Sequence, residues 1–342
     1  MKISRKIVLF IVLLLAGLTI SFLNPNWSLL AILLVILSFI VIDISPYIPT
    51  IITMSRKNWG WPDNPFPPAH SDLIYGTYQG KNLTLDIYLP KGKEEKSPFP
   101  LIVFIHGGGW FMGNKKLIEP GIFSLLKEGY AVASIGYSLS GEAQWPTQGY
   151  QIKGAVRWLR ANAHRYHIDP DKFIAFGGSA GGHLASFLGT TNGLKEFDSA
   201  EYGNMEYSSN VQGVVAWYAP TDLLLKYNFS ILNLLVLDGN RLNPRSPRGK
   251  LIGGAVSLNT NIAQKASPQY YISSNTTVPF LIMHGNKDVI VPVEQSLSFY
   301  KKLQNAGIKS ELVILKNYRH VDIRFNNQEN MRIVIEFIND KV

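Results

Sequence analysis

Residues 176–183 read FGGSAGGH, and they decide the fold, because a serine stands between glycines where an apolar run ends and a helix can begin. A serine hydroxyl is a weak nucleophile and reacts only when a sharp turn exposes it to a base and to backbone donors. Glycines two positions before and after Ser179 permit such a turn, since a side chain there would collide with the adjoining strand or helix. The alternative is a glycine loop that holds a phosphate at a helix N-terminus. A base and a carboxylate elsewhere in the chain would favour the catalytic serine over the phosphate-binding loop.

The amino-acid composition excludes several kinds of catalytic site and of binding partner. The chain has 342 residues, no cysteine and a formal charge of +9. Disulfides, thiolate nucleophiles and cysteine-bound metal centres are therefore excluded. The basic residues are scattered, apart from small clusters at 2–6 and 241–250, and they form no basic stripe with interleaved aromatics. We expect no nucleic-acid partner, no metal and no cofactor.

The first 54 residues are predicted to be a membrane anchor. Apolar runs at 7–23 and 29–48 are separated by a short turn, and lysine or arginine residues precede the first run and follow the second. We favour a two-helix hairpin in the lipid bilayer over a single signal anchor or a cleaved signal peptide. The positive-inside rule then predicts a multi-pass protein of the cell membrane with its catalytic domain in the cytoplasm.

A linker rich in proline, tryptophan and asparagine is predicted at 55–71, before a single domain at 72–342. Strands and helices alternate through this domain, which predicts an α/β fold with a doubly wound, mostly parallel sheet. Residues 222–271 do not fit the alternation of strands and helices, and we expect them to form a helical insertion over the site around Ser179. The expected strands are 83–89, 100–105, 130–137, 173–176, 211–218, 278–284 and 311–315, and the expected helices are 149–164, 180–188, 294–306 and 328–338.

An oxyanion loop is predicted at 106–110, where HGGGW follows an apolar strand. Glycines let backbone N–H groups approach a substrate oxygen without obstruction. The N–H groups of Gly108, Gly109 and Ala180 are the candidate donors. A tight glycine turn without catalytic meaning is the competing interpretation.

The serine needs a base and a carboxylate that orients the base. Asp288 follows a buried-type strand, and Asp222 follows another and is the reserve candidate. His320 lies after the last strand, where it can reach back to the serine, whereas packing or a hydrogen bond that supports the catalytic residues is expected for His183 and His284. The order Ser179, Asp288, His320 is that of a Ser-Asp-His hydrolase triad.

Several motifs in this order resemble the α/β-hydrolase carboxylesterases, in the branch near the bacterial feruloyl-esterase-like and hormone-sensitive-lipase-like enzymes. They are HGGGW, the run 145–185, LIGGA at 251–255, ASPQYY at 266–271 and the run 280–307. The resemblance implies an α/β-hydrolase fold and ester hydrolysis without a cofactor. The chain departs from the pattern in two places. Gly178 stands where hormone-sensitive-lipase relatives usually have aspartate, and no glycine stands beside His320.

The sequence thus predicts a serine hydrolase that cleaves small-molecule carboxylic esters through an acyl-enzyme. The alternatives are an amide-cleaving hydrolase of the same fold, a lipase or deacylase acting on membrane lipid, and a non-catalytic membrane interaction protein. Trp110, Trp145, Trp217 and the insertion are expected to shape the pocket.

Overall fold

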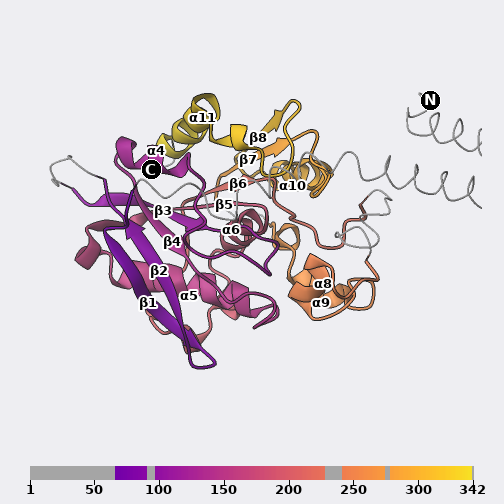
Figure 1. The fold of residues 1–342 in the computed structure, drawn as a ribbon, viewed down its shortest axis with the longest axis horizontal. Coiled ribbons are helices and arrows are strands. Elements are labelled where there is room, and N and C mark those ends of the chain that lie inside the picture. The colour runs from indigo at the N-terminus through magenta and orange to yellow at the C-terminus, as the bar shows by residue number, and fades with distance from the viewer. Residues whose placement is uncertain (1–65, 91–96, 228–240, 274–277, 341–342) are drawn as a thin grey trace, which may run out of the picture.

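The computed structural model describes residues 66–90, 97–227, 241–273 and 278–340. They build one eight-stranded sheet in the order β1-β2-β4-β3-β5-β6-β7-β8, flanked by helices (Figure 1). The predicted anchor at 1–54 and most of the predicted linker lie outside the described residues. Within the described ranges, no helix combines the length and the apolar character needed to cross a membrane.

The strands run parallel from β4 to β8, while β2 is antiparallel to both of its neighbours. The mostly parallel sheet expected from the alternation of strands and helices is therefore confirmed. The strands are β1 (His70–Tyr78), β2 (Lys81–Tyr88), β3 (Phe99–Ile105), β4 (Ala131–Ile135), β5 (Ile168–Gly178), β6 (Gly213–Trp217), β7 (Phe280–Gly285) and β8 (Ser310–Leu315).

Strand β3 shows why the central strands are continuously apolar. Leu101 and Val103 belong to the hydrophobic core on one face of the sheet, and Ile102 and Phe104 belong to the core on the other. Successive side chains of a strand point to opposite faces, so a strand covered on both faces must be apolar at every position.

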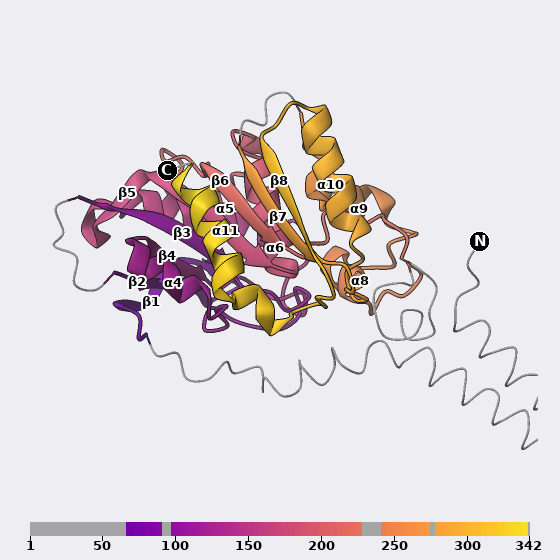
Figure 2. The same cartoon turned by 90° about the horizontal axis from the view of Figure 1, so that it is seen from above.

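Helices cover both faces of the sheet (Figure 2). Helices α5 (Thr147–Ala161), α6 (Ala180–Thr190) and α10 (Glu294–Asn305) contribute to one core, and α4 (Ile122–Glu128) and α11 (Gln328–Asn339) contribute to the other. Shorter 3-10 helices are His164–Tyr166, Lys195–Phe197, Ala200–Tyr202, Pro268–Tyr270 and Ile323–Asn326.

Two elements are not expected from the sequence. Strand β1 begins at His70, inside the predicted linker, and forms a hairpin with β2. Both turn residues, Gln79 and Gly80, have positive φ, which matches the twist of a tight hairpin. Helix α4 has only 7 residues, too few for a helical repeat to show in the sequence.

In its described part, the chain between β6 and β7 forms the short α-helices α8 (Pro247–Ile252) and α9 (Thr260–Lys265). They occupy part of the predicted insertion at 222–271, of which 228–240 lies outside the described residues. The backbone N–H of Trp145 donates to the carbonyl of Leu251 at 2.8 Å. The segment is thus attached to the loop that precedes α5.

The carboxyl ends of the parallel strands meet at one edge of the sheet, because every neighbouring pair from β4 to β8 runs in the same direction. Ile105 at the end of β3 pairs with Gly177 of β5, and Gly178 pairs with Trp217 at the end of β6. The loops that follow these strands lie side by side, and the candidate site is built from them.

Candidate active site

Ser179 lies on a sharp turn between β5 and α6. Its backbone has φ 55° and ψ −123°, a conformation that a residue with a side chain rarely adopts. A Cβ on Gly181 would lie 2.0 Å from the carbonyl oxygen of Ile105, and one on Gly177 would lie 2.3 Å from the carbonyl carbon of Gly181. Both glycines are therefore required by close backbone packing, as the G-x-S-x-G pattern predicts.

The structure brings Ser179, His320 and Asp288 together in one chain of hydrogen bonds. Nδ1 of His320 lies 2.6 Å from Oδ2 of Asp288, and Nε2 lies 2.9 Å from Oγ of Ser179. A carboxylate only accepts hydrogen bonds, so Nδ1 carries the proton and donates it to Asp288. The bare Nε2 then accepts the hydrogen bond of the serine hydroxyl. This geometry suits the transfer of a proton from Ser179 to His320.

Asp288 is fixed as a buried anion. Its Oδ1 accepts hydrogen bonds from the backbone N–H groups of Ile290 and Val291, both at 2.9 Å. Nε2 of His284 lies 3.2 Å from Oδ2. Burial alone would raise the pKa of Asp288, but His320 and His284 outweigh that effect and hold the pKa well below its usual value. The carboxylate is therefore ionised when it faces His320.

Asp222, the reserve candidate, does not reach His320. Its Oδ1 accepts the backbone N–H of Leu224 at 2.8 Å, and its own N–H donates to the side chain of Gln295. The bond of the carboxylate is local to the turn after β6, and the backbone bond ties this turn to α10. Of the two aspartates, only Asp288 is hydrogen-bonded to the imidazole.

The loop that carries His320 keeps a glycine-like conformation without glycine. Val321 has φ 55°, in the left-handed region that disfavours a β-branched residue. The sequence departs here from the glycine beside the histidine that is common in relatives. The backbone nevertheless adopts the conformation that glycine would favour, so His320 still reaches Ser179.

The HGGGW loop after β3 lies against the turn that holds Ser179. A Cβ on Gly107 would be 2.9 Å from the carbonyl oxygen of Gly178 and 3.6 Å from Cβ of Ser179. Gly108 and Gly109 have φ values of 118° and 58°, which glycine adopts without strain. The structure thus places the candidate oxyanion loop beside the serine. Ala180 is the first residue of α6, where a backbone N–H has no partner inside the helix.

The buried side chain of His106 orients the HGGGW loop. Its Nδ1–H donates to the carbonyl of Gly107 at 2.8 Å, which fixes the plane of the peptide whose N–H belongs to Gly108. The ring stacks on Tyr137 with centroids 4.4 Å apart, and the Tyr137 hydroxyl donates to the His106 carbonyl at 3.1 Å. Burial lowers the pKa of His106 to about 4, so the ring is neutral at pH 7.

His183 has the packing role expected from the sequence. Its Nδ1 accepts the indole N–H of Trp110 at 3.2 Å, and its Nε2 donates to the carbonyl of Ala266 at 2.6 Å. Burial lowers the pKa of His183 to about 4. The side chain thereby connects the HGGGW loop, helix α6 and the segment between β6 and β7.

Of the three tryptophans expected at the pocket, Trp110 and Trp145 belong to the same core as helix α6, but Trp217 belongs to the core on the other face of the sheet. Its side chain is 0% exposed and packs between Phe176 and Phe325 in the opposite core. The expectation for Trp217 is wrong because a residue of a strand covered on both faces can point away from the site. On the site's side, Pro247 of α8 lies 3.6 Å from the position of a Cβ on Gly109.

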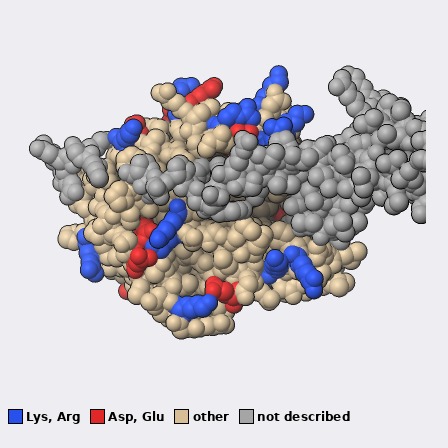
Figure 3. Space-filling view, in the orientation of Figure 1, with Lys and Arg blue, Asp and Glu red and all other residues tan. Residues whose placement is uncertain are grey.

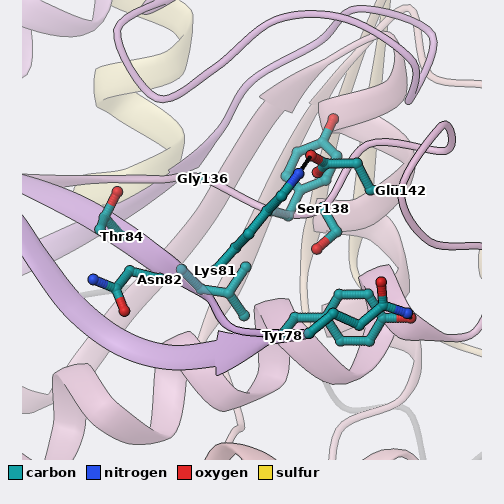
Figure 4. Close-up of a pocket in the computed structure, with 10 residues that line it drawn as sticks. Tyr78, Lys81, Asn82, Thr84, Gly136, Ser138 and Glu142 are labelled. Carbon is teal, nitrogen blue, oxygen red and sulfur yellow. Dashed lines mark hydrogen bonds and ion pairs between the residues drawn. The ribbon is translucent and has the colours of Figure 1, made fainter.

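A separate cavity of about 240 Å³ lies between the β1–β2 hairpin and the loop after β4 (Figure 4). Its two charged residues, Lys81 and Glu142, pair with each other at 2.5 Å. No member of the Ser179 hydrogen-bond chain lines it. The cavity is therefore distinct from the candidate active site, although Tyr137 belongs to its wall and also contacts His106.

Basic and acidic side chains are interspersed on the face shown in Figure 3, without a continuous basic stripe. Across the part of the chain that the structure describes, no group of three histidine, aspartate or glutamate residues is arranged to hold a metal ion. The chemistry that the described site offers through its own side chains is that of serine, histidine and carboxylate.

Comparison with known proteins places these features in a family. The chain is 32% identical over 242 residues to the probable carboxylic ester hydrolase LipM of Mycobacterium tuberculosis, with 70% of this chain and 53% of that protein covered. It is 30% identical over 248 residues to the esterase LipQ of the same organism, with 72% and 55% covered. The chain thus spans about half the length of these relatives.

A solved structure, the truncated form of a carbohydrate esterase from gut microbiota, superimposes with a TM-score of 0.72 at 28% identity, covering 82% of this chain and 98% of that one. The α/β-hydrolase fold and the resemblance to carboxylesterases are thereby confirmed. The BD-FAE family model matches residues 85–303, which include the HGGGW loop, Ser179 and Asp288. With this match over more than half of its length, the chain belongs to the BD-FAE family.

Proposed function

We propose that this protein is a carboxylic ester hydrolase that works through an acyl-enzyme on Ser179. The observation that carries the proposal is the hydrogen-bond chain from Asp288 through His320 to a serine held at φ 55°. The esterases LipM and LipQ support the choice of an ester as substrate.

The reaction begins when His320 takes the hydroxyl proton of Ser179 and the serine oxygen attacks the ester carbonyl. Asp288 stabilises the imidazolium that forms, because it is held ionised beside Nδ1. The N–H groups of Gly108, Gly109 and Ala180 are the proposed donors to the oxyanion.

The tetrahedral intermediate then collapses. The carbon–oxygen bond to the alcohol breaks, and His320 returns its proton to the leaving alkoxide. A water molecule, activated by the same imidazole, attacks the acyl-enzyme and releases the carboxylic acid and Ser179. The residues supply a base, an orienting anion and backbone donors, so no step requires a cofactor.

The first 54 residues are proposed to anchor this enzyme in the cell membrane, with the hydrolase domain on the cytoplasmic side. The proposal rests on the two apolar runs and the flanking basic residues. A reporter fused after Val342 should be active inside the cell. Activity of the reporter only outside the cell would reverse the orientation.

The catalytic assignment is tested with Ser179→Ala in the full-length protein. Hydrolysis of a short-chain aryl ester should fall by several orders of magnitude, and labelling by a fluorophosphonate should disappear. Ser186→Ala is the matched control, because Ser186 lies on the same helix and its buried hydroxyl has no hydrogen-bond partner among the described residues. Retained hydrolysis and labelling in Ser179→Ala would contradict the assignment.

A further inference from the structure

Tyr218 is a buried residue of the site that the triad does not include. It directly follows β6, its side chain is 2% exposed, and its backbone has φ 39°. Its N–H donates to the carbonyl of Met283 at 2.8 Å. A non-glycine residue keeps a positive φ only where its surroundings hold it there, and such positions concentrate at functional sites.

The ring of Tyr218 packs directly on the imidazole of His320. The two ring centroids are 4.8 Å apart with an interplanar angle of 66°. Phe325, in the 3-10 helix that follows the His320 loop, packs against the ring of Tyr218, with a centroid distance of 4.7 Å and an interplanar angle of 73°. Tyr218 therefore contacts the imidazole whose two nitrogens are bonded to Asp288 and Ser179.

The hydroxyl of Tyr218 is tied to a second carboxylate. It lies 3.1 Å from Oε1 of Glu119, and Oε2 of Glu119 accepts the side-chain N–H of Asn326 at 2.8 Å. Oδ1 of Asn326 in turn accepts the backbone N–H of Gly121 at 2.9 Å. Glu119 thus holds both the tyrosine that packs on His320 and the chain that leaves the His320 loop.

The same phenol explains why residue 178 is glycine. A Cβ on Gly178 would lie 2.8 Å from Oη of Tyr218 and 3.0 Å from Cζ. There is no room for the aspartate that hormone-sensitive-lipase relatives usually carry at this position. In this chain the side chain of Tyr218, at the end of the neighbouring strand, fills the space beside the turn that holds Ser179.

We propose that Tyr218 and Glu119 are positioning residues for His320. The proposal rests on the proposed function of the triad and deepens it. His320 must exchange protons with Ser179, the leaving alcohol and water while its Nδ1–H stays on Asp288, so a small rotation of the ring misplaces one partner. The ring of Tyr218, anchored by Glu119 through its hydroxyl, limits that rotation.

The test measures ester hydrolysis by full-length Glu119→Ala, Glu119→Gln and Tyr218→Phe. Glu119→Ala and Tyr218→Phe should lower kcat about tenfold and leave KM within about twofold, because they act on the orientation of the base and not on substrate binding. Glu119→Gln should restore most of kcat, since its amide can donate to the tyrosine oxygen and its carbonyl can accept from Asn326. Glu128→Ala, an exposed glutamate at the end of α4, is the matched control.

A second readout does not depend on turnover. The Nδ1–H of His320 should give a far-downfield proton resonance, which should broaden or move upfield in Glu119→Ala and remain unchanged in Glu128→Ala. Folded Glu119→Ala and Tyr218→Phe proteins with wild-type kcat and an unshifted resonance would overturn the proposal. A Glu119→Gln protein as impaired as Glu119→Ala would also overturn it.

The two proposals fail in different ways. If the proposed function is wrong, the wild-type protein neither hydrolyses esters nor reacts with a fluorophosphonate, while the resonance still reports whether Glu119 holds His320. If only the positioning role is wrong, the wild-type protein is active and reactive, and the Glu119 and Tyr218 variants match it.

Discussion

The turn around Ser179 and the loop around His320 hold two partners of one hydrogen bond by different means. The serine turn is fixed within a few residues, since Gly177 and Gly181 contact each other and the end of β3. The histidine loop is held by side chains from distant parts of the chain, Asp288 and Tyr218. A site can thus join a locally determined half to a half that exists only once the whole sheet has formed.

On the histidine side, the largest effect is expected from Asp288→Asn. An amide in place of the carboxylate no longer fixes the tautomer or stabilises the imidazolium, so kcat should fall by about a thousandfold to ten thousandfold. Steady-state hydrolysis of an aryl ester measures this loss. Asp222→Asn is the control and should stay within about twofold, because the Asp222 carboxylate accepts the backbone N–H of Leu224 and does not bond to His320. Equal losses in the two variants would show that Asp288 has no special role.

On the serine side, Gly181→Ala should be the most damaging single methyl group. Its Cβ would lie 2.0 Å from the carbonyl oxygen of Ile105, where only backbone movement can relieve the contact. We expect the free energy of unfolding to fall by about 3 kcal/mol and activity to be lost with the turn. Urea unfolding followed by tryptophan fluorescence measures the change. Gly141→Ala, with no atom within 4 Å of its Cβ, should be neutral. A Gly181→Ala protein as stable as wild type would show that the turn is less constrained than its contacts indicate.

The contact of His183 in α6 with Ala266 of the β6–β7 segment should make the stability of the fold sensitive to acid. Burial lowers the pKa of His183 in the folded protein to about 4 from its ordinary value of 6.5, so the unfolded chain binds the extra proton first as pH falls. Stability should therefore decline from about pH 6.5 to about pH 4, by up to roughly 3 kcal/mol for this residue.

His183→Gln isolates that contribution. Glutamine does not titrate, yet it can accept the Trp110 N–H and donate to the Ala266 carbonyl. Its unfolding free energy should fall less than that of wild type between about pH 6.5 and about pH 4, and His106 accounts for part of the remaining decline. Parallel curves for the two proteins would show that His183 does not resist protonation.

The smallest effect is expected from Tyr137→Phe. The substitution removes the hydrogen bond to the His106 carbonyl but keeps the stacked ring. A single neutral hydrogen bond contributes about 1 kcal/mol, so kcat should fall no more than about fivefold. Tyr150→Phe is the control, since no hydrogen bond of the Tyr150 hydroxyl occurs within the described ranges. A loss as large as that of Asp288→Asn would mean that the oxyanion loop depends on this one bond.

The half of the site that is determined locally is the half that the sequence predicts well. The serine turn, the HGGGW loop and the central strands follow from glycine spacing and continuous apolar runs. Asp288 and His320 are predictable from their places after strands, because carboxyl ends of parallel strands meet at one edge. Asp288 can be separated from Asp222 only by distance, since both follow strands.

Contacts between distant residues account for what the sequence does not predict. Glu119, Tyr218 and Asn326 are far apart in the chain and share no motif, although the place of Tyr218 directly after β6 is a signal that could have identified it. Trp217 is misplaced at the pocket because the face of a strand buried on both sides cannot be read from its composition. Strand β1 escapes prediction because its polar residues and its position beside the proline-rich stretch resemble a linker.

The attachment of the β6–β7 segment has a consequence for how substrate preference can change. Its described part is hydrogen-bonded at Leu251 to the loop before α5 and at Ala266 to the helix that follows Ser179. A segment fixed at two points can exchange its exposed side chains while the turn that holds Ser179 and helix α6 remain in place. We therefore expect new acyl or alcohol specificities to arise in small steps from a library confined to exposed positions such as Leu242, Leu258 and Ile262, which leaves the buried Ser246 and Val256 unchanged.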